Sequence, residues 1–166
     1  MLKRVVILLA GCVVAGAVMG AEPVVIGEKD GKDIVTVRVR EAAQSKQDLP
    51  VFPGISGKTA GAKGISLLKV VIPPGGAAKP HVHQGFESAI YLLQGRVETK
   101  YGDGLAKSVV NEAGDFLFIP PDVPHQPVNL SKTEPAIAIV ARNDPDEQEH
   151  VIAYPGEGGA SPKSGD

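Results

Sequence analysis

Two histidines one residue apart are the most chemically suggestive feature of the sequence. His81 and His83 follow a turn rich in Gly and Pro, and alternate residues of a β-strand point to the same face. Both imidazoles would therefore face one point in space, and Glu87, four residues beyond His83, can join them once the chain turns back. Such a trio indicates a metal site, although a His-x-His pair on a strand is more often a surface or core feature.

A second cluster follows in the segment from Gly114 to Asn129. Pro120 and Pro124 belong to a run of prolines that stiffens the turn before His125. The chain holds four histidines, and three of them fall in these two clusters. The fourth, His150, lies apart in the charged run 144–150, where we expect it to be solvated.

Together the two clusters resemble the two sequence motifs of the cupins. The first motif spaces a Gly, a His-x-His pair, a Glu and a second Gly, and the second motif spaces a Gly, a Pro, a His and an Asn. The 18 residues between them, Arg96 to Ala113, are typical of compact bacterial cupins. The matching residues are Gly75, His81, His83, Glu87 and Gly95 in the first motif and Gly114, Pro120, His125 and Asn129 in the second.

The match departs from the motifs at two positions. Seven residues separate Glu87 from Gly95, where the motif has six, so counting back from the glycine puts Ser88 in the place of the glutamate. Glu87 stays the candidate because no other acidic residue lies between His83 and Gly95. Asp122 stands where the second motif has Gly, a mild change because Asp tolerates left-handed backbone geometry better than most residues.

The resemblance implies an all-β fold: a cupin, which is a jelly-roll-like antiparallel β-barrel, as a single domain with a metal inside near one mouth. By the same resemblance, a divalent transition metal is held by four side chains. Relative affinity alone does not choose between Fe, Mn, Ni, Co, Cu and Zn. The alternative is a barrel whose histidines merely fill its interior. The implied ligands are His81, His83, Glu87 and His125.

Fold and metal do not select a reaction. The resemblance favours a metal-dependent enzyme acting on a small molecule, with dioxygenase-type oxidative cleavage first and isomerase or lyase chemistry next. Glu87 would then have a catalytic role, leaving the metal to accept a proton. The alternative is a non-catalytic module that binds a metal or a small ligand. By analogy with small cupins, we also expect a homodimer paired through the outer sheets, with Ile34 to Arg40 a plausible participant.

The surrounding sequence predicts the short strands that such a site needs. Twenty glycines and 14 prolines divide the chain, and alternation of apolar and polar residues indicates strands between them. The segment 42–64 shows no clean period, and we expect a long connection over the barrel mouth. The strands are predicted at Ile34 to Arg40, Ile65 to Ile72, Ala89 to Leu93, Arg96 to Tyr101, Ala106 to Val110, Phe116 to Ile119 and Ile137 to Ala141.

Charge and cysteine content exclude several classes of function. Lys and Arg number 17 against 19 Asp and Glu, for a net charge of -2, so we expect no nucleic-acid partner. The single cysteine, Cys12, allows neither an intramolecular disulfide nor a cysteine-rich metal site.

The first residues predict export. Lys3 and Arg4 precede the uncharged segment 5–19 and a stretch of small residues ending at Ala21, as in a secretory signal peptide over 1–21. The mature protein would be periplasmic or secreted, with no membrane span. Alternatively, the segment ending in Cys12 resembles a lipobox, which would make the protein a lipoprotein anchored there. We divide the remainder into N-terminal strands and a long loop (22–64), the barrel core (65–154) and a disordered tail (155–166).

Overall fold

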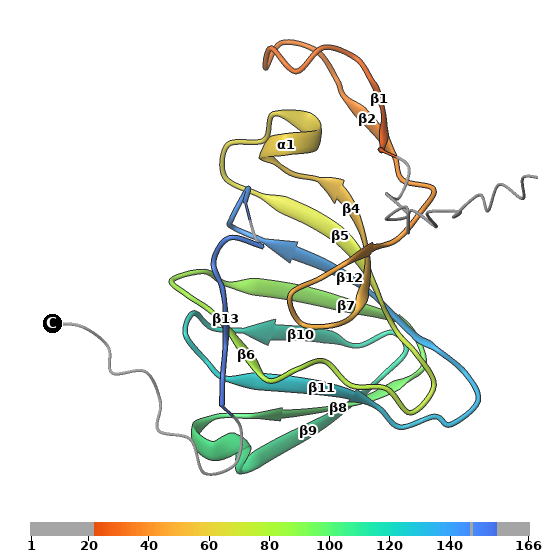
Figure 1. The fold of residues 1–166 in the computed structure, drawn as a ribbon, viewed down its shortest axis with the longest axis vertical. Helices are drawn as coiled ribbons and strands as arrows, with labels where there is room; N and C mark the ends of the chain where they lie inside the picture. The colour runs from red at the N-terminus through yellow and green to blue at the C-terminus, as the bar shows by residue number, and fades with distance from the viewer. Residues whose placement is uncertain (1–21, 147, 156–166) are drawn as a thin grey trace, which may run out of the picture.

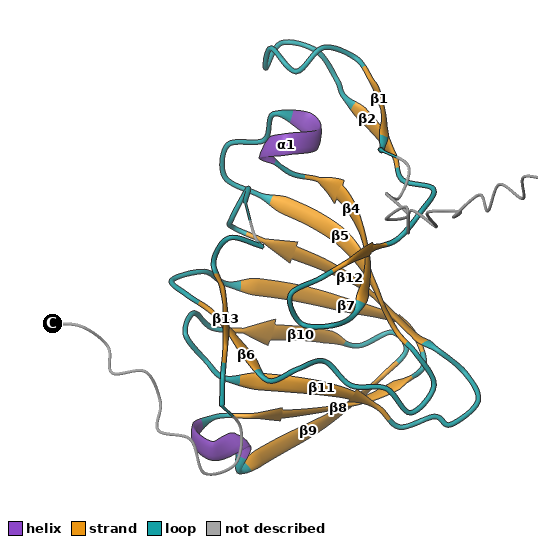
Figure 2. Ribbon diagram, in the orientation of Figure 1, coloured by secondary structure: helices purple, strands orange, loops and turns teal. Residues whose placement is uncertain are grey.

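The computed structural model describes residues 22–146 and 148–155. The predicted signal peptide, Cys12 and all but the first residue of the predicted tail lie outside these ranges. Two antiparallel sheets face each other as a barrel, and a small hairpin projects beside the α1 end of it (Figure 1). The described residues are almost entirely strands and turns (Figure 2). The prediction of a single all-β domain is confirmed.

The larger sheet has six strands. In spatial order they are β10 (Phe116–Ile119), β7 (Ser88–Gln94), β12 (Ala136–Arg142), β5 (Ser66–Ile72), β4 (Pro50–Ile55) and β3 (Ala43–Gln44).

The second sheet has five strands, and a two-stranded hairpin stands outside both sheets. The five strands, in spatial order, are β13 (Val151–Ala153), β6 (His81–His83), β11 (His125–Asn129), β8 (Arg96–Tyr101) and β9 (Lys107–Glu112). The remaining elements are β1 (Val24–Ile26) and β2 (Thr36–Arg38) of the hairpin, the helix α1 (Gly57–Ala60) and a 3-10 turn (Asp103–Leu105).

The segment 42–64 differs from the prediction of a long connection. It contains β3, β4 and α1, and β4 pairs with β5 in the larger sheet. Pro50, Pro53 and Gly54 interrupt the pattern that indicates a strand, yet Val51 is buried in the core, as a central strand residue should be. The larger sheet therefore includes strands of this segment. The strand predicted at Ile34 to Arg40 is also shorter, since β2 covers Thr36–Arg38 and lies in the outer hairpin.

Alternation along the strands separates an apolar interior from the outer faces. On β10, Leu117 and Ile119 line the interior, whereas Phe116 and Phe118 are exposed on the opposite face. One core cluster joins both sheets, since Val97 of β8 packs with residues of the larger sheet. Its buried members are Leu49, Ile72, Ala78, Leu92, Val97 and Ala136.

Asn129 joins the end of β5 to the segment that leads into β12. Its amide nitrogen donates to the carbonyl oxygens of Ile72, Pro73 and Glu134 at 2.8–3.1 Å, and its side-chain oxygen accepts from the backbone N–H of Ser131. The side chain is 1% exposed. This residue closes the second motif, and here its one side chain bonds backbone groups on both sides of the junction between β5 and β12.

Across the described residues, no helix is long and apolar enough to cross a membrane.

Candidate metal centre

Three histidines converge inside the barrel from two neighbouring strands. His81 and His83 lie on β6, and His125 on β11 is the direct cross-strand partner of His81. All three are at most 5% exposed, and one ring nitrogen from each lies within 4.8 Å of the others. Nitrogen ligands bind zinc at about 2.0–2.1 Å and therefore stand about 3–4 Å apart around one ion. The three imidazoles are close to the arrangement that a shared metal ion requires.

Backbone carbonyls fix two of the rings in the tautomer that a metal ligand needs. Nδ1 of His81 lies 2.8 Å from the carbonyl oxygen of Lys79, and Nδ1 of His125 lies 2.9 Å from that of Val123. A carbonyl only accepts hydrogen bonds, so Nδ1 carries the proton and Nε2 keeps its lone pair. Orientation of a histidine through its second nitrogen is typical of metal ligands.

The site holds its histidines in the neutral form. Burial lowers the pKa of His81 to about 3 and that of His125 to about 4. Burial, followed by the positive charge of Arg142, also lowers the pKa of His83. Neutral imidazoles have lone pairs to donate, so at neutral pH a metal ion would displace no proton from these rings.

Arg142 is a residue of this centre that the sequence analysis missed. It lies at the end of β12, is buried, and donates from Nη2 to Nε2 of His83 at 3.1 Å and from Nε to the hydroxyl of Ser88 at 3.0 Å. Ser88 is the residue that occupies the glutamate position when counted back from Gly95. Counting back from Gly95 was the signal in the sequence that pointed to Ser88, the partner of Arg142, because it placed a hydroxyl where the motif has a carboxylate.

The Nδ1 atom of His83 is buried, and among the described residues it has no hydrogen-bond partner. A buried polar atom without a partner is unfavourable unless a water, an ion or a ligand satisfies it. Arg142 only donates, so Nε2 of His83 accepts its hydrogen bond and Nδ1 carries the proton; an ion would bind Nε2 of His83 in place of Arg142. The free Nε2 lone pairs of His81 and His125 beside it suit a divalent transition metal. Three histidines of this kind could bind such an ion.

The structure does not bring Glu87 to the three histidines. Its side chain is exposed, and its backbone N–H donates to the side-chain oxygen of Asn143. The physical reason is the alternation of β7: Ser88 begins the strand facing inward and is 1% exposed, so the preceding residue faces outward. Within the described residues, the metal-capable group comprises the histidines alone.

His150 is less solvated than its charged surroundings suggest. Its Nδ1 lies 2.8 Å from Oδ2 of Asp144, a carboxylate that is 1% exposed, and its ring packs on Phe86 with centroids 4.8 Å apart. The side chain itself remains 43% exposed. It is not a member of the metal-capable group.

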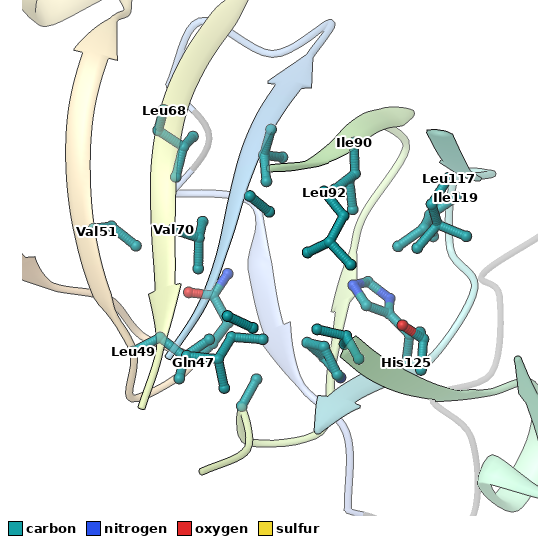
Figure 3. Close-up of a pocket in the computed structure, with 18 of the residues that line it drawn as sticks. Gln47, Leu49, Val51, Leu68, Val70, Ile90, Leu92, Leu117, Ile119 and His125 are labelled. Atoms are coloured by element: carbon teal, nitrogen blue, oxygen red, sulfur yellow. The ribbon is translucent and has the colours of Figure 1, made fainter. Parts of the chain in front are cut away.

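A mainly apolar cavity of about 110 Å³ adjoins the histidines. In Figure 3 the imidazole of His125 lies among aliphatic side chains that converge from several strands. Polar residues at its lining are the three histidines, Arg142, one acidic residue, Asp115, and a few neutral ones such as Gln47 and Thr99. The site can therefore accept a small molecule with a polar end and an apolar body. Labelled apolar residues are Leu49, Val51, Leu68, Val70, Ile90, Leu92, Leu117 and Ile119.

Comparison with known proteins agrees with this geometry. Residues 68–142 match the family described as the cupin domain. The germin-like protein subfamily T member 3 of Arabidopsis thaliana is 33% identical over 61% of this chain and 44% of its own. An auxin-binding protein of Prunus persica is 26% identical over 72% of this chain and 55% of its own. The chain thus spans about half the length of these curated relatives.

Two solved oxalate decarboxylases share the fold. That of Lactobacillus farciminis, in a formate complex, has a TM-score of 0.59 and 24% identity over 69% of this chain and 33% of its own. That of Bacillus subtilis, studied for its Mn(II) centres, has a TM-score of 0.58 and 20% identity over 69% of this chain and 30% of its own. At this identity the likeness establishes the cupin fold of the described residues.

Proposed function

We propose that this chain is a metal-dependent enzyme in which His81, His83 and His125 hold a divalent transition metal and a small molecule reacts in the adjoining cavity. The observation that carries the proposal is the convergence of three buried, neutral imidazoles, two of them oriented by backbone carbonyls. Manganese and iron are the ions to test first, since the Bacillus subtilis oxalate decarboxylase contains Mn(II) centres. When bound, such an ion would polarise substrate oxygen atoms and support chemistry with dioxygen.

The remaining residues favour a reaction that needs little acid–base help from the protein. Glu87 is exposed and outside the histidine group, which removes the support for its proposed role as proton acceptor. The cavity walls instead exclude water and hold the apolar body of a substrate. Oxidative cleavage of a small substrate by dioxygen is our first reaction class, because in it the metal would carry the chemistry and the protein would mainly bind the substrate. Isomerase or lyase chemistry, which relies more on a protein base, ranks below it.

The second candidate is a binding module without catalysis. It is favoured by the same shortage of acid–base groups around an apolar cavity, and the peach relative is named for binding auxin rather than for a reaction. The two candidates differ in one measurement. An oxidative enzyme loaded with Fe(II) or Mn(II) would consume dioxygen with a catechol, flavonol, thiol or small carboxylic acid, and an isomerase or lyase would convert its compound without dioxygen, whereas a module would bind the compound without turnover.

Elemental analysis tests the metal site itself. We expect about one transition-metal ion per chain in protein purified from its own host, and loss of most of it in His81→Ala and His125→Ala. His150→Ala is the matched control, because it removes the one histidine outside the group. Equal metal content in all four proteins would contradict the assignment.

We also propose that the chain is exported and that it pairs as a homodimer. The support for export is the charged, apolar and small-residue pattern of residues 1–21. Support for pairing is the exposed apolar outer face at Phe116, Phe118 and Leu93. Cell fractionation with mass measurement of the mature N-terminus tests the first and separates cleavage near Ala21 from lipidation at Cys12. Sedimentation tests the second.

A further inference from the structure

Asp122 connects the two chain segments that carry the three histidines. It lies in the turn between β10 and β11, three residues before His125. Its backbone N–H donates to the carbonyl oxygen of His83 at 3.2 Å, and its Oδ1 accepts from the backbone N–H of Gly85 at 3.0 Å. One residue of the second segment therefore holds the first segment both at His83 and two residues beyond it.

The turn that contains Asp122 also orients the third imidazole. Val123, the next residue in the chain, places its carbonyl oxygen 2.9 Å from Nδ1 of His125. Within the part of the chain that the structure describes, the ladder between β6 and β11 contains one residue pair, His81 opposite His125. The two hydrogen bonds of Asp122 extend this short connection to His83. All three rings are thus tied to one another through the backbone.

The backbone conformation of Asp122 indicates that its side chain has a purpose. Its φ is 60°, in the left-handed region, which is unfavourable for a residue with a Cβ and is adopted freely by glycine. Glycine is also the residue of the cupin motif at this position. A side chain in such a strained conformation persists where surrounding contacts compensate for the strain. The hydrogen bond between its carboxylate and the N–H of Gly85 is such a contact.

We propose that Asp122 is a positioning residue of the metal centre, which holds the His83 segment and the His125 turn together before a metal ion binds. This inference rests on the proposed metal site and goes beyond it by naming the residue that prepares the ligands. Groups that are already in place lose less conformational entropy when their partner binds. Loss of the carboxylate contact should therefore weaken metal binding although every ligand is still present.

The test is a titration of metal-free protein with Mn²⁺ at pH 7, following the EPR signal of free Mn²⁺. Asp122→Gly introduces the residue of the motif and removes the carboxylate. We expect it to raise the Kd for Mn²⁺ about 3- to 10-fold, the modest effect of losing one solvent-exposed hydrogen bond. Asp122→Ala removes the same carboxylate but keeps a Cβ, and its Kd should rise at least as much. Circular dichroism establishes that each variant folds, and either of the two is sufficient.

Asp122→Asn separates positioning from charge. Asparagine tolerates a left-handed backbone and offers a side-chain oxygen to the N–H of Gly85, so we expect a Kd within about twofold of the wild type. A residue that acted only through its negative charge would lose its effect in this variant as well.

Asp30→Gly is the matched control. Asp30 is exposed in the loop between β1 and β2, and its Oδ1 accepts from the backbone N–H of Lys32 at 2.9 Å. The substitution removes the same charge and a similar hydrogen bond from the outer hairpin, and the Kd for Mn²⁺ should equal that of the wild type.

The outcomes separate this inference from the proposed function. Wild-type affinity for Mn²⁺ in Asp122→Gly and Asp122→Ala overturns the positioning role and leaves the metal site standing. The same conclusion follows if Asp122→Asn or Asp30→Gly weakens binding as much as Asp122→Gly, because a general effect of charge would then account for the change. Failure of the wild type to bind Mn²⁺, Fe²⁺ or Co²⁺ overturns both the inference and the metal site.

Discussion

Arg142 donates a hydrogen bond of 3.1 Å to His83 across the inside of the barrel. The two residues belong to different sheets, since β12 lies in the six-stranded sheet and β6 in the five-stranded one. The same guanidinium holds Ser88 on β7. One buried cation thus joins three strands at the site where we place the metal. A change at Arg142 should therefore affect both the stability of the barrel and the position of His83.

Replacing Arg142 by Met should destabilise the metal-free protein. Methionine keeps much of the length but removes the donors to Ser88 and His83, leaving buried acceptors without partners. We expect the free energy of unfolding to fall by about 2–4 kcal/mol, measured by urea denaturation. Lys107→Met, a change of an exposed lysine, should shift it by less than about 0.5 kcal/mol. Equal effects of the two substitutions would show that the Arg142 contacts contribute nothing.

The metal-free protein should lose stability in mild acid. Its folded state keeps His81 and His125 neutral down to a pKa of about 3 and about 4, whereas the unfolded chain takes up these protons near 6.5. The unfolded state therefore binds more protons below pH 6.5, and stability falls as pH decreases. Each such histidine contributes a slope of up to about 1.4 kcal/mol per pH unit. Urea denaturation between pH 7 and 4 measures it.

The control for this acid effect is His125→Gln, which removes one of the titrating rings. Its free energy of unfolding should fall less steeply with decreasing pH than that of the wild type. Gln84→Ala, at an exposed residue without a titrating side chain, should retain the wild-type slope. A flat profile in the wild type would mean that the three rings are not held neutral.

Asn129→Asp should destabilise the fold although the two side chains have nearly the same shape. The change replaces an amide that donates to three carbonyl oxygens with a carboxylate that repels them. We expect a loss of about 2–4 kcal/mol at pH 7, seen as a lower urea midpoint. Gln94→Glu makes the same chemical change at an exposed side chain with one carbonyl partner, and its effect should be under about 1 kcal/mol. A midpoint for Asn129→Asp as high as for Gln94→Glu would refute the role of Asn129.

Two motif glycines should respond differently to alanine. Gly95 and Gly114 both have left-handed backbones, at φ of 92° and 102°. A Cβ at Gly95 would lie 2.9 Å from both Cα and Cβ of Ala136, whereas a Cβ at Gly114 meets nothing within 4 Å. Gly114→Ala should therefore lower the free energy of unfolding by about 1–2 kcal/mol, the cost of a left-handed backbone at a residue with a side chain. Gly95→Ala should lower it by about 1–3 kcal/mol more, because its Cβ also meets Ala136. Thermal melts of the two variants compare them, and equal melting temperatures would contradict the close packing.

Much of the fold could be predicted because strand alternation and turn residues are local signals. The strands β5, β7, β8, β9, β10 and β12 match segments that the sequence indicates within a few residues. The strand β4 was hidden because its prolines and glycine resemble a loop, while its place in the sheet depends on pairing with β5. Local composition cannot report such pairing.

At the site, the three histidines could be predicted from the sequence, whereas Arg142 could not. His81 and His83 share a face through simple alternation, and the motif links them to His125. Arg142 meets Ser88 across 54 positions of sequence, and that contact follows from the register of β12 on β7. Glu87 seemed the natural fourth ligand because it is acidic, but the direction in which β7 begins decides that Ser88 faces inward. The register between two strands and the side of the sheet to which a residue points both depend on the tertiary structure, so the local sequence does not reveal them.

The central claim, that three histidines share one metal ion, is tested most directly by anomalous diffraction. Crystals soaked with Mn²⁺ and measured with anomalous scattering should show one strong peak within bonding distance of ring nitrogens of His81, His83 and His125, with the Glu87 carboxylate outside its coordination shell. Absence of a peak among these rings in crystals that take up Mn²⁺, or a peak bound by other residues, would contradict the account.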